Sequence, residues 1–471
     1  MKKILWFAII SLISTQIWAM DNLTSLSQVL TAIDQTLLER LTGVLGCIAM
    51  LGLAFLMSVN RRRISWRLVG FGLTLQFGLA FFLLKFDAGR QIFEAANTGI
   101  NQILSFSNKG ASFLFGNLVW MNVPVGLVSE GGVMGNLQST GSWANTGAFF
   151  AFSVLPSIIF FSALTAVLYH VRILEWAVRA VSFVVQRTMR SSGAESFSAV
   201  ANIFVGQTEA PFLVKPFLSK MTRSEIMAVM TGGFANVSGG VMAAYVGMLQ
   251  GSFSDIAGHL LTASVMSAPA SLVFAKIMVP ELGTPETLKS SGVHVEKQDS
   301  NLLDAASRGT TDGLHLALNV GAMLIAFIAL IAMFNWMIGG IGAWAGYADM
   351  SLEVIFAYIF SPLAWLLGVP WSDAHVVGSL FGTKTVVNEM VAYLQMAGDI
   401  SAGHILHEKS VVIAAYALCG FANFSSIGIQ IGGLSALAPE RRVDFAQLGL
   451  RAMIAGALTS FQTAAMAGIL L

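Results

Sequence analysis

The sequence contains 471 residues, of which 55% are hydrophobic and only 11% are charged. A water-soluble domain has about a quarter of its residues charged, so this composition excludes an ordinary soluble protein. The length instead allows about ten apolar passes of roughly 20 residues each, and the net charge of +1 gives no indication of a nucleic-acid partner.

The first residues combine two lysines with a short apolar stretch that polar residues interrupt. We interpret residues 1–19 as a signal peptide or as an additional N-terminal helix, and the sequence leaves both readings open. Either reading places the next residues on the outer side of the membrane. Such an N-terminal segment, followed by many apolar stretches, indicates a multi-pass protein of a bacterial inner membrane.

Residues 20–145 are predicted to form N-terminal scaffold helices and an interfacial helix. Spans are expected near residues 43–59 and 67–85, because three arginines directly after the first span mark its cytoplasmic end. The stretch from about residue 87 to residue 145 is amphipathic and too polar to span. We expect it to lie along the outer interface.

Residues 146–280 are predicted to form a first repeat, which begins with a span near residues 149–170. The moderately apolar segment 195–218 has basic residues on both flanks, so both of its ends should lie on the cytoplasmic side. This pattern predicts a re-entrant hairpin. A broken helix at residues 226–248 and a further span follow it.

Residues 281–312 carry the longest charged stretch and are expected to be a cytoplasmic connector. Residues 313–471 form the predicted second repeat. It contains a hairpin at residues 373–397 that enters from outside and a broken helix at residues 409–433. The expected fold is therefore all-α, with about eight transmembrane helices, two inverted re-entrant hairpins and interfacial helices.

A short motif relates the two halves. Gly-Phe-Ala-Asn occurs at residues 233–236, after Glu209, and again at residues 420–423, after Glu389. Inverted repeats that each contain a broken segment are typical of the midplane binding site of a secondary transporter. A helix broken in the membrane exposes backbone polar groups that lipid cannot satisfy, so these groups must face protein, solute or water.

The two glutamates need polar partners, since an ionised side chain at the bilayer centre costs roughly 3 kcal/mol on insertion scales. We expect both to face one shared cavity. Purely structural roles are also possible for these residues. The motif could serve helix packing, and each glutamate could form an ion pair with Lys215 or Lys384. Asn388 could cap a helix and have no other role.

Three longer motifs carry a family resemblance. They are Asn202–Pro211, with the sequence NIFVGQTEAP, Asn388–Tyr393, with NEMVAY, and Cys419–Gly428, with CGFANFSSIG. They resemble the hallmark motifs of the concentrative nucleoside transporter family, and the resemblance runs from about residue 43 to the end. It implies a homotrimer of scaffold and transport parts, in which the transport part moves like an elevator.

The resemblance also implies roles for individual residues. The residues that would bind the nucleoside are Gln207, Thr208, Glu209 and Val241 around the base, Phe421 against base and sugar, and Glu389, Asn423 and Ser426 on the ribose. The residues that would bind a sodium ion are Asn202 and Asn236 by their side chains and Val205 and Val237 by their carbonyl groups. A carboxylate suits adjacent ribose hydroxyls, because it only accepts hydrogen bonds.

The chain departs from the common family pattern at Asn236, where a hydroxyl residue is frequent, and at residues 238–240. An amide oxygen still suits sodium, so we favour sodium as the coupling ion and leave a proton open. No other cofactor is expected.

The predicted function is an ion-coupled nucleoside symporter, and purine or pyrimidine preference stays open. The first alternative is a transporter for another small polar solute such as a carboxylate, but neither hairpin contains an arginine to bind it. A membrane-embedded enzyme is the second alternative, but the sequence contains no metal-binding motif or acidic cluster of the kind that such an enzyme usually needs. No phosphate-binding GxxxxGK[ST] loop supports an ATP-driven pump.

Overall fold

The computed structural model describes residues 26–120, 122–127, 138–145, 150–207, 209–288, 299–344, 346–347, 350–405 and 407–471. Residues 1–19, the expected signal peptide or additional helix, and the candidate site residue Thr208 lie outside these residues. The described chain is helical except for one antiparallel two-stranded hairpin. The fold is that of an all-helical membrane protein, as the composition predicts.

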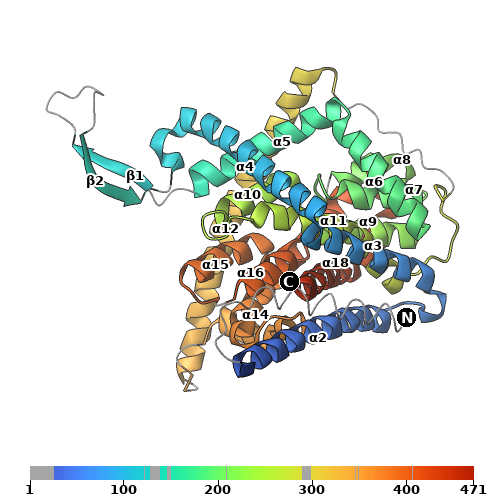
Figure 1. Cartoon of the computed structure of the whole chain (residues 1–471). Helices are drawn as coiled ribbons and strands as arrows, with labels where there is room; N and C mark the ends of the chain where they lie inside the picture. Colours follow the sequence, from blue (N-terminus) through green and yellow to red (C-terminus); the bar gives the residue numbers. More distant parts are fainter. Residues whose placement is uncertain are drawn as a thin grey trace.

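Three long helices form the N-terminal part: α2 (Leu26–Leu56), α3 (Trp66–Lys85) and α4 (Asp87–Phe115). The turn between α2 and α3 holds η1 (Arg61–Arg63), whose arginines are exposed. Arg61 donates to the carbonyl oxygens of Phe55 and Leu56 at 3.1 and 2.7 Å, and so satisfies the free end of α2. Helix α2 lies along one edge of the molecule (Figure 1).

The strands β1 (Asn122–Leu127) and β2 (Gln138–Asn145) follow η2 (Gly116–Val119) and protrude from the helical body (Figure 1). The sequence analysis expected no strand here. The signal was present, since Val123, Val125 and Leu127 alternate with other residues in the pattern of a strand. A two-stranded ribbon also tolerates Pro124, because its outer edge needs no donor.

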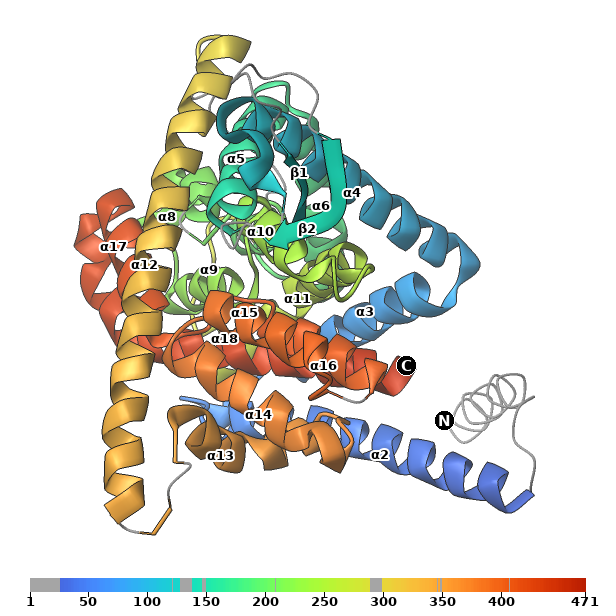
Figure 2. The same cartoon turned by 90° about the vertical axis from the view of Figure 1, so that its left-hand side faces the viewer.

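A peripheral pair of helices packs closely. The pair consists of α5 (Leu155–His170) and α12 (Leu302–Trp344), and α5 continues directly from η3 (Phe150–Val154). A Cβ atom at Gly309 would lie 2.6 Å from Cβ of Ala166, so only glycine permits this approach. Helix α12 runs along one side of the molecule (Figure 2). It begins inside the connector expected at residues 281–312, because Asn301 caps it by accepting from the Asp304 amide at 3.0 Å.

The first repeat holds the predicted hairpin and break. After α6 (Ile173–Met189), the hairpin consists of α7 (Gly193–Ala201), η4 (Ala210–Val214) and α8 (Lys215–Leu218). The next helix is interrupted between α9 (Arg223–Ala235) and α10 (Gly239–Leu249), and α11 (Ile256–Met278) completes the unit. The interruption begins at Asn236, whose backbone is extended.

The second repeat has the same order of elements. Helix α13 (Leu352–Leu366) leads into a hairpin of α14 (Trp371–Val386) and α15 (Glu389–Ser401). The following helix is interrupted between α16 (Glu408–Leu418) and α17 (Phe424–Leu437), and η5 (Pro439–Arg441) with α18 (Arg442–Leu470) ends the chain. Between α13 and α14 the axis turns by 119°, at Gly368 with a φ of 96°.

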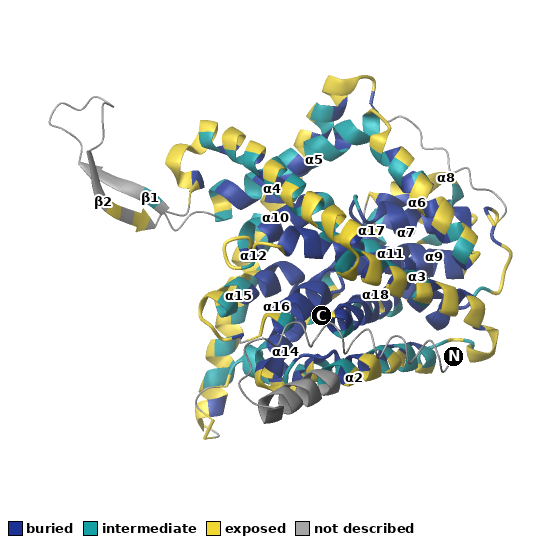
Figure 3. Cartoon of the chain, viewed as in Figure 1, coloured by how far each residue is buried: buried dark blue, intermediate teal, exposed yellow. Residues whose placement is uncertain are grey.

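Burial separates the hairpins and broken helices of the two repeats from the peripheral helices, which include α5 and α12 although the sequence analysis placed them in the repeats (Figure 3). The apolar windows of α9–α10 and α11 are 94% and 89% buried, whereas that of α12 is 11% buried. The described residues contain seven helices that are long and apolar enough to cross a membrane, or eight if the bent pair α13–α14 is one span. The core therefore lies within the repeats, and apolar side chains of α2, α3 and α12 face outward.

Candidate functional site

The two interrupted helices touch at their breaks. Gly420, with a φ of 139°, lies so close to the first break that a Cβ atom there would be 2.8 Å from the Phe234 carbonyl oxygen. The two Gly-Phe-Ala-Asn motifs are therefore in direct contact, although almost two hundred residues separate them in sequence. The motif therefore packs the two helices together, and the same contact can also form part of a binding site.

A cavity of about 930 Å³ opens beside this contact. One wall comes from both hairpin tips and both breaks, and the other wall comes mainly from α5 and α12. The expected nucleoside-binding residues that line it are Gln207, Glu209, Val241, Glu389, Phe421, Asn423 and Ser426. Both glutamates thus face one cavity, whose volume is in the upper range of small-molecule sites.

Glu389 is buried and held on both carboxylate oxygens. Oε1 accepts a hydrogen bond from the Tyr245 hydroxyl at 2.9 Å, and Oε2 accepts one from the Asn423 amide at 2.8 Å. Asn423 is itself fixed, because its Oδ1 accepts from the Ser426 amide at 2.9 Å and so caps α17. The carboxylate keeps lone pairs for a donor in the cavity.

Tyr245 does not line the cavity but orients Glu389, a role that the sequence analysis missed. It lies on α10 four residues after Val241, so both side chains occupy one helix face. Its ring packs against Tyr393 with a centroid distance of 4.3 Å, and Tyr393 donates to the Ala415 carbonyl at 2.7 Å. Nothing in the sequence distinguishes Tyr245, because its burial and its hydrogen bond to Glu389 appear only in the folded structure.

The first hairpin tip bears a second, less buried carboxylate. Glu209 Oε2 accepts from the Gly206 amide at 3.0 Å, and its side chain is open to the cavity. Gln207 is buried, and its Oε1 has no hydrogen-bond partner. These groups give the cavity free acceptors beside the aromatic ring of Phe421 and the methyl groups of Val241.

The expected ion ligands lie behind the first hairpin tip, away from the cavity except for Val205. Asn202 and Asn236 are 1% and 2% exposed, and the Oδ1 atom of each has no hydrogen-bond partner. The tip contacts the break directly, since the Gly239 amide donates to the Phe204 carbonyl at 3.1 Å. Buried oxygens without donors suit a hard cation, so these residues fit a sodium ion.

The opposite wall was not predicted. It includes Tyr169 and His170 of α5 and Asp312 and Asn319 of α12. The Tyr169 hydroxyl and the His170 Nδ1 are buried without hydrogen-bond partners. The sequence carries a signal on α12 that the sequence analysis missed, since Arg308, Asp312, His315 and Asn319 recur at helical spacing and all line the cavity. Helix α5 offers no such pattern, because most of its residues are apolar.

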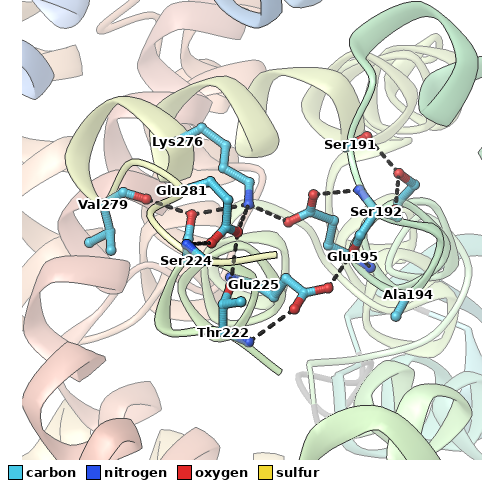
Figure 4. Close-up of polar contacts among 12 residues, drawn as sticks. Ser191, Ser192, Ala194, Glu195, Thr222, Ser224, Glu225, Lys276, Val279 and Glu281 are labelled. Atoms are coloured by element: carbon cyan, nitrogen blue, oxygen red, sulfur yellow. Dashed lines mark hydrogen bonds and ion pairs between the residues drawn. The ribbon is translucent and has the colours of Figure 1, made fainter. Parts of the chain in front are cut away.

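A cluster of charges fixes the base of the first hairpin (Figure 4). The ammonium of Lys276, on α11, lies 2.7 Å from Glu195 and 3.1 Å from Glu281. The Ser192 hydroxyl donates to Glu225 at 2.6 Å, which joins the first turn of α7 to that of α9. The helices that bear Asn202 and Asn236 are therefore tied together at their starts.

No hydrogen bond or ion pair joins Lys215 to Glu209 or Lys384 to Glu389 among the described residues. Lys215 is exposed, and Lys384 donates to the Ala417 carbonyl at 2.6 Å instead of to Glu389. Asn388 caps α15 by accepting from the Val391 amide at 2.9 Å, so the expected cap is present. Asn388 also lines the cavity.

Comparison with known families agrees along most of the chain. Residues 259–468 match the family described as "Na+ dependent nucleoside transporter C-terminus" and residues 45–118 match its N-terminus. Residues 151–252 match the domain described as "Nucleoside recognition". The matched regions include both hairpins and both breaks.

Similar proteins occur in bacteria and mammals. An uncharacterized transporter of Haemophilus influenzae is 42% identical over 432 residues, which cover 91% of this chain and 97% of that protein. The uncharacterized transporter YutK of Bacillus subtilis is 41% identical and covers 91% and 99%. Sodium/nucleoside cotransporter 1 of Rattus norvegicus is 38% identical, over 92% of this chain and 64% of that protein.

Solved structures share the fold. CNTnw in an inward-facing substrate-bound state superposes with a TM-score of 0.81 at 41% identity, over 91% of this chain and 97% of that chain. A CNTnw variant in an outward-facing state gives a TM-score of 0.82 at 39% identity, over 92% and 99%. The motifs, the fold and the relatives agree: this chain is a multi-pass membrane transporter, not an enzyme, and belongs to the concentrative nucleoside transporter family.

Proposed function

We propose that this chain is a sodium-coupled symporter that takes up nucleosides across the bacterial inner membrane. The observation that carries the proposal is the convergence of Glu209 and Glu389 on one cavity at the contact of the two breaks. Such a cavity offers carboxylate and amide oxygens together with an aromatic face. A nucleoside presents the complementary groups, namely sugar hydroxyls and a flat base.

The two ends of the solute have different partners in this proposal. Glu389, Asn423 and Ser426 hold the ribose hydroxyls, since charge-assisted hydrogen bonds to a carboxylate are the stronger kind. The base lies near the first hairpin tip, against Gln207, Thr208 and Glu209. Phe421 and Val241 pack on its faces.

The coupling ion is sodium in this proposal, held by Asn202 and Asn236 with the carbonyl groups of Val205 and Val237. The unpaired Oδ1 atoms of both asparagines support this assignment, because a buried oxygen without a donor costs about 1–3 kcal/mol. A cation at this position would recover that free energy. It would also fix the hairpin tip against the break that forms the nucleoside site.

Movement follows from the two walls of the cavity. We propose that the hairpins and broken helices move as one body against α5 and α12, and so open the site to each side in turn. CNTnw, which shares the fold, has been solved in inward-facing and outward-facing states. Three copies would assemble through the peripheral helices, whose outer faces are apolar.

The test is uptake into liposomes with sodium and pH gradients varied independently. Inward sodium gradients should drive accumulation of labelled uridine, and pH gradients alone should not. Glu389→Gln should reduce uptake at least a hundredfold, because the ribose loses its charged acceptor, while Glu353→Gln, outside the cavity, serves as the matched variant. Near-normal uptake by Glu389→Gln would remove the ribose role.

The same assay separates the alternative substrate class. A labelled dicarboxylate should not be taken up, since the carboxylates of both hairpin tips repel an anion and neither hairpin offers an arginine. The two arginines that line the cavity elsewhere, Arg172 and Arg308, are already paired with carboxylates. Uptake of the dicarboxylate without uptake of uridine would overturn the proposal.

A further inference from the structure

Lys384 is a fully buried lysine that has no part in the function proposed above. It lies on α14, near the second hairpin tip, and its exposed fraction is 0%. Its ammonium donates to the carbonyl of Ala417, which α16 leaves free just before its break. The ring of Phe461 lies beneath the ammonium at 5.7 Å. A buried charge with so specific a setting calls for a function.

The repeat relation gives Lys384 a counterpart. It precedes the hairpin glutamate Glu389 by five residues, and Phe204 precedes Glu209 by the same interval. Phe204 is the residue whose carbonyl accepts from the Gly239 amide at the first break, next to the expected ion ligand Val205. In both repeats this position therefore joins the hairpin tip to the broken helix.

The two repeats differ in how the oxygens at this contact are satisfied. In the first repeat the Oδ1 atoms of Asn202 and Asn236 have no donor. In the second repeat the oxygen of Ala417 has its lysine, and the motif asparagine Asn423 is hydrogen-bonded at both ends of its amide. The first repeat thus lacks a cation at the place where the second repeat carries its own.

The charges of the two hairpins also indicate that the first repeat lacks a cation that the second repeat has. Each hairpin contributes one carboxylate to the cavity, Glu209 from the first and Glu389 from the second. The second hairpin also contributes the buried ammonium of Lys384, whereas the described residues of the first hairpin include only the exposed Lys215 as a cation. A second positive charge, supplied from outside, would make the two halves electrostatically alike.

We propose that Lys384 is a tethered cation that performs in the second repeat the task that a bound sodium ion performs in the first. It fixes the hairpin tip to the break and offsets the charge of Glu389. One repeat then needs an ion and the other does not, so one sodium ion accompanies each nucleoside. This inference rests on the proposed sodium coupling.

The test compares the unmodified chain with Lys384→Met and Lys384→Arg. In the unmodified chain, sodium should promote nucleoside binding with a Hill slope of about one, and each nucleoside should carry one charge into liposomes. Lys384→Met should weaken nucleoside binding at least tenfold at low sodium. High sodium should restore binding with a Hill slope approaching two, and the charge per nucleoside should rise toward two. Lys384→Arg keeps the charge and should keep a slope of one.

Two results would overturn the inference. One is a folded Lys384→Met variant with the sodium slope and charge ratio of the unmodified chain. The other is loss of nucleoside binding at every sodium concentration, because sodium then cannot replace the ammonium. Sodium-independent binding by the unmodified chain would instead contradict the proposed coupling, so the two failures are distinguishable.

A second variant covers a failure of Lys384→Met to fold. Lys384→Ala leaves space for a small amine, so methylammonium in the medium should restore its thermal stability and nucleoside binding. Tetramethylammonium cannot donate a hydrogen bond to Ala417 and should restore neither. Equal effects of the two amines, or none from either, would contradict the role of the tethered donor.

Discussion

Single side chains in the cavity owe their geometry to neighbours far away in the sequence. Glu389 is oriented by Tyr245 of the other repeat, 144 residues away, and by Asn423, 34 residues away. The acids and the motif asparagines could be predicted, because an ionisable side chain in an apolar segment stands out. Tyr245 could not, since a tyrosine in an apolar helix is unremarkable until its partner is placed.

Tyr245→Phe tests this orientation. The variant removes one hydrogen bond to a charged group, worth about 1.5–3 kcal/mol, and keeps the ring that packs on Tyr393. We expect nucleoside affinity to fall roughly 10- to 100-fold, with a smaller loss for a 2′,3′-dideoxynucleoside that lacks the hydroxyls. Equilibrium binding of both solutes measures the difference. Equal losses would show that Tyr245 does not act through the ribose.

Asn202→Ala tests the ion ligands. Loss of one oxygen ligand should raise the half-saturating sodium concentration about tenfold or more, corresponding to roughly 1.4 kcal/mol, and leave the order of nucleoside preference unchanged. Sodium titrations of uptake measure the shift. Ser196→Ala, on the same helix and also buried, is the matched variant and should leave the titration unchanged, because the Ser196 hydroxyl already donates to the Ser192 carbonyl at 2.7 Å.

At the scale of helices, the first turns of α7 and α9 determine where their far ends lie. Both begin with a capping box, Ser192 with Glu195 and Thr222 with Glu225, and the sequence contains both patterns. What the sequence does not reveal is that the boxes are joined to each other and to Lys276. Local patterns predict helix starts, whereas contacts between helices require the packed structure.

Lys276→Met tests the junction. It leaves the carboxylate of Glu195 buried without its cation, and breaking such a pair costs about 3–5 kcal/mol. We expect a lower unfolding temperature and weaker sodium activation, because both asparagine ligands stand on the joined helices. Adding Glu195→Gln should recover part of the lost stability. A double variant as unstable as Lys276→Met would contradict this account.

The same junction predicts a dependence on acid. Burial raises the pKa of Glu281, but Lys276 and the Gly283 amide outweigh it and hold the pKa below its usual value. A lowered folded pKa stabilises the fold above about pH 4.3, and this stability is lost as the pH falls through the folded value. The unfolding temperature of the unmodified chain should therefore fall more steeply below pH 5 than that of Glu281→Gln. Parallel curves would contradict the role of Glu281.

At the scale of the whole molecule, the inverted order of hairpin and broken helix could be predicted from two short motifs and the basic residues beside the spans. The β1–β2 hairpin was missed although its residues alternate as in a strand, and the facing of α5 toward the cavity could not be predicted. The first turns of α12 show their cavity face by polar residues at helical spacing, whereas its later turns are apolar around the whole circumference and give no direction. Glycines at the α5 contact, such as Gly309 and Gly313, have meaning only once the partner is known.

The proposed division into a moving body and a fixed wall predicts where a reagent acts. Asn319, on α12, lines the cavity but belongs to the wall, whereas Ile325, one and a half turns later, is exposed and does not line the cavity. In a chain without Cys47 and Cys419, a charged thiol reagent should block uptake by Asn319→Cys and leave Ile325→Cys active, because lipid shields the outer face of α12. Sodium with nucleoside should change the reaction rate at Asn319→Cys severalfold, since the body that covers this position moves during transport. A rate that is the same with and without solute would mean that α12 and the repeats move together, and the wall would then belong to the moving body.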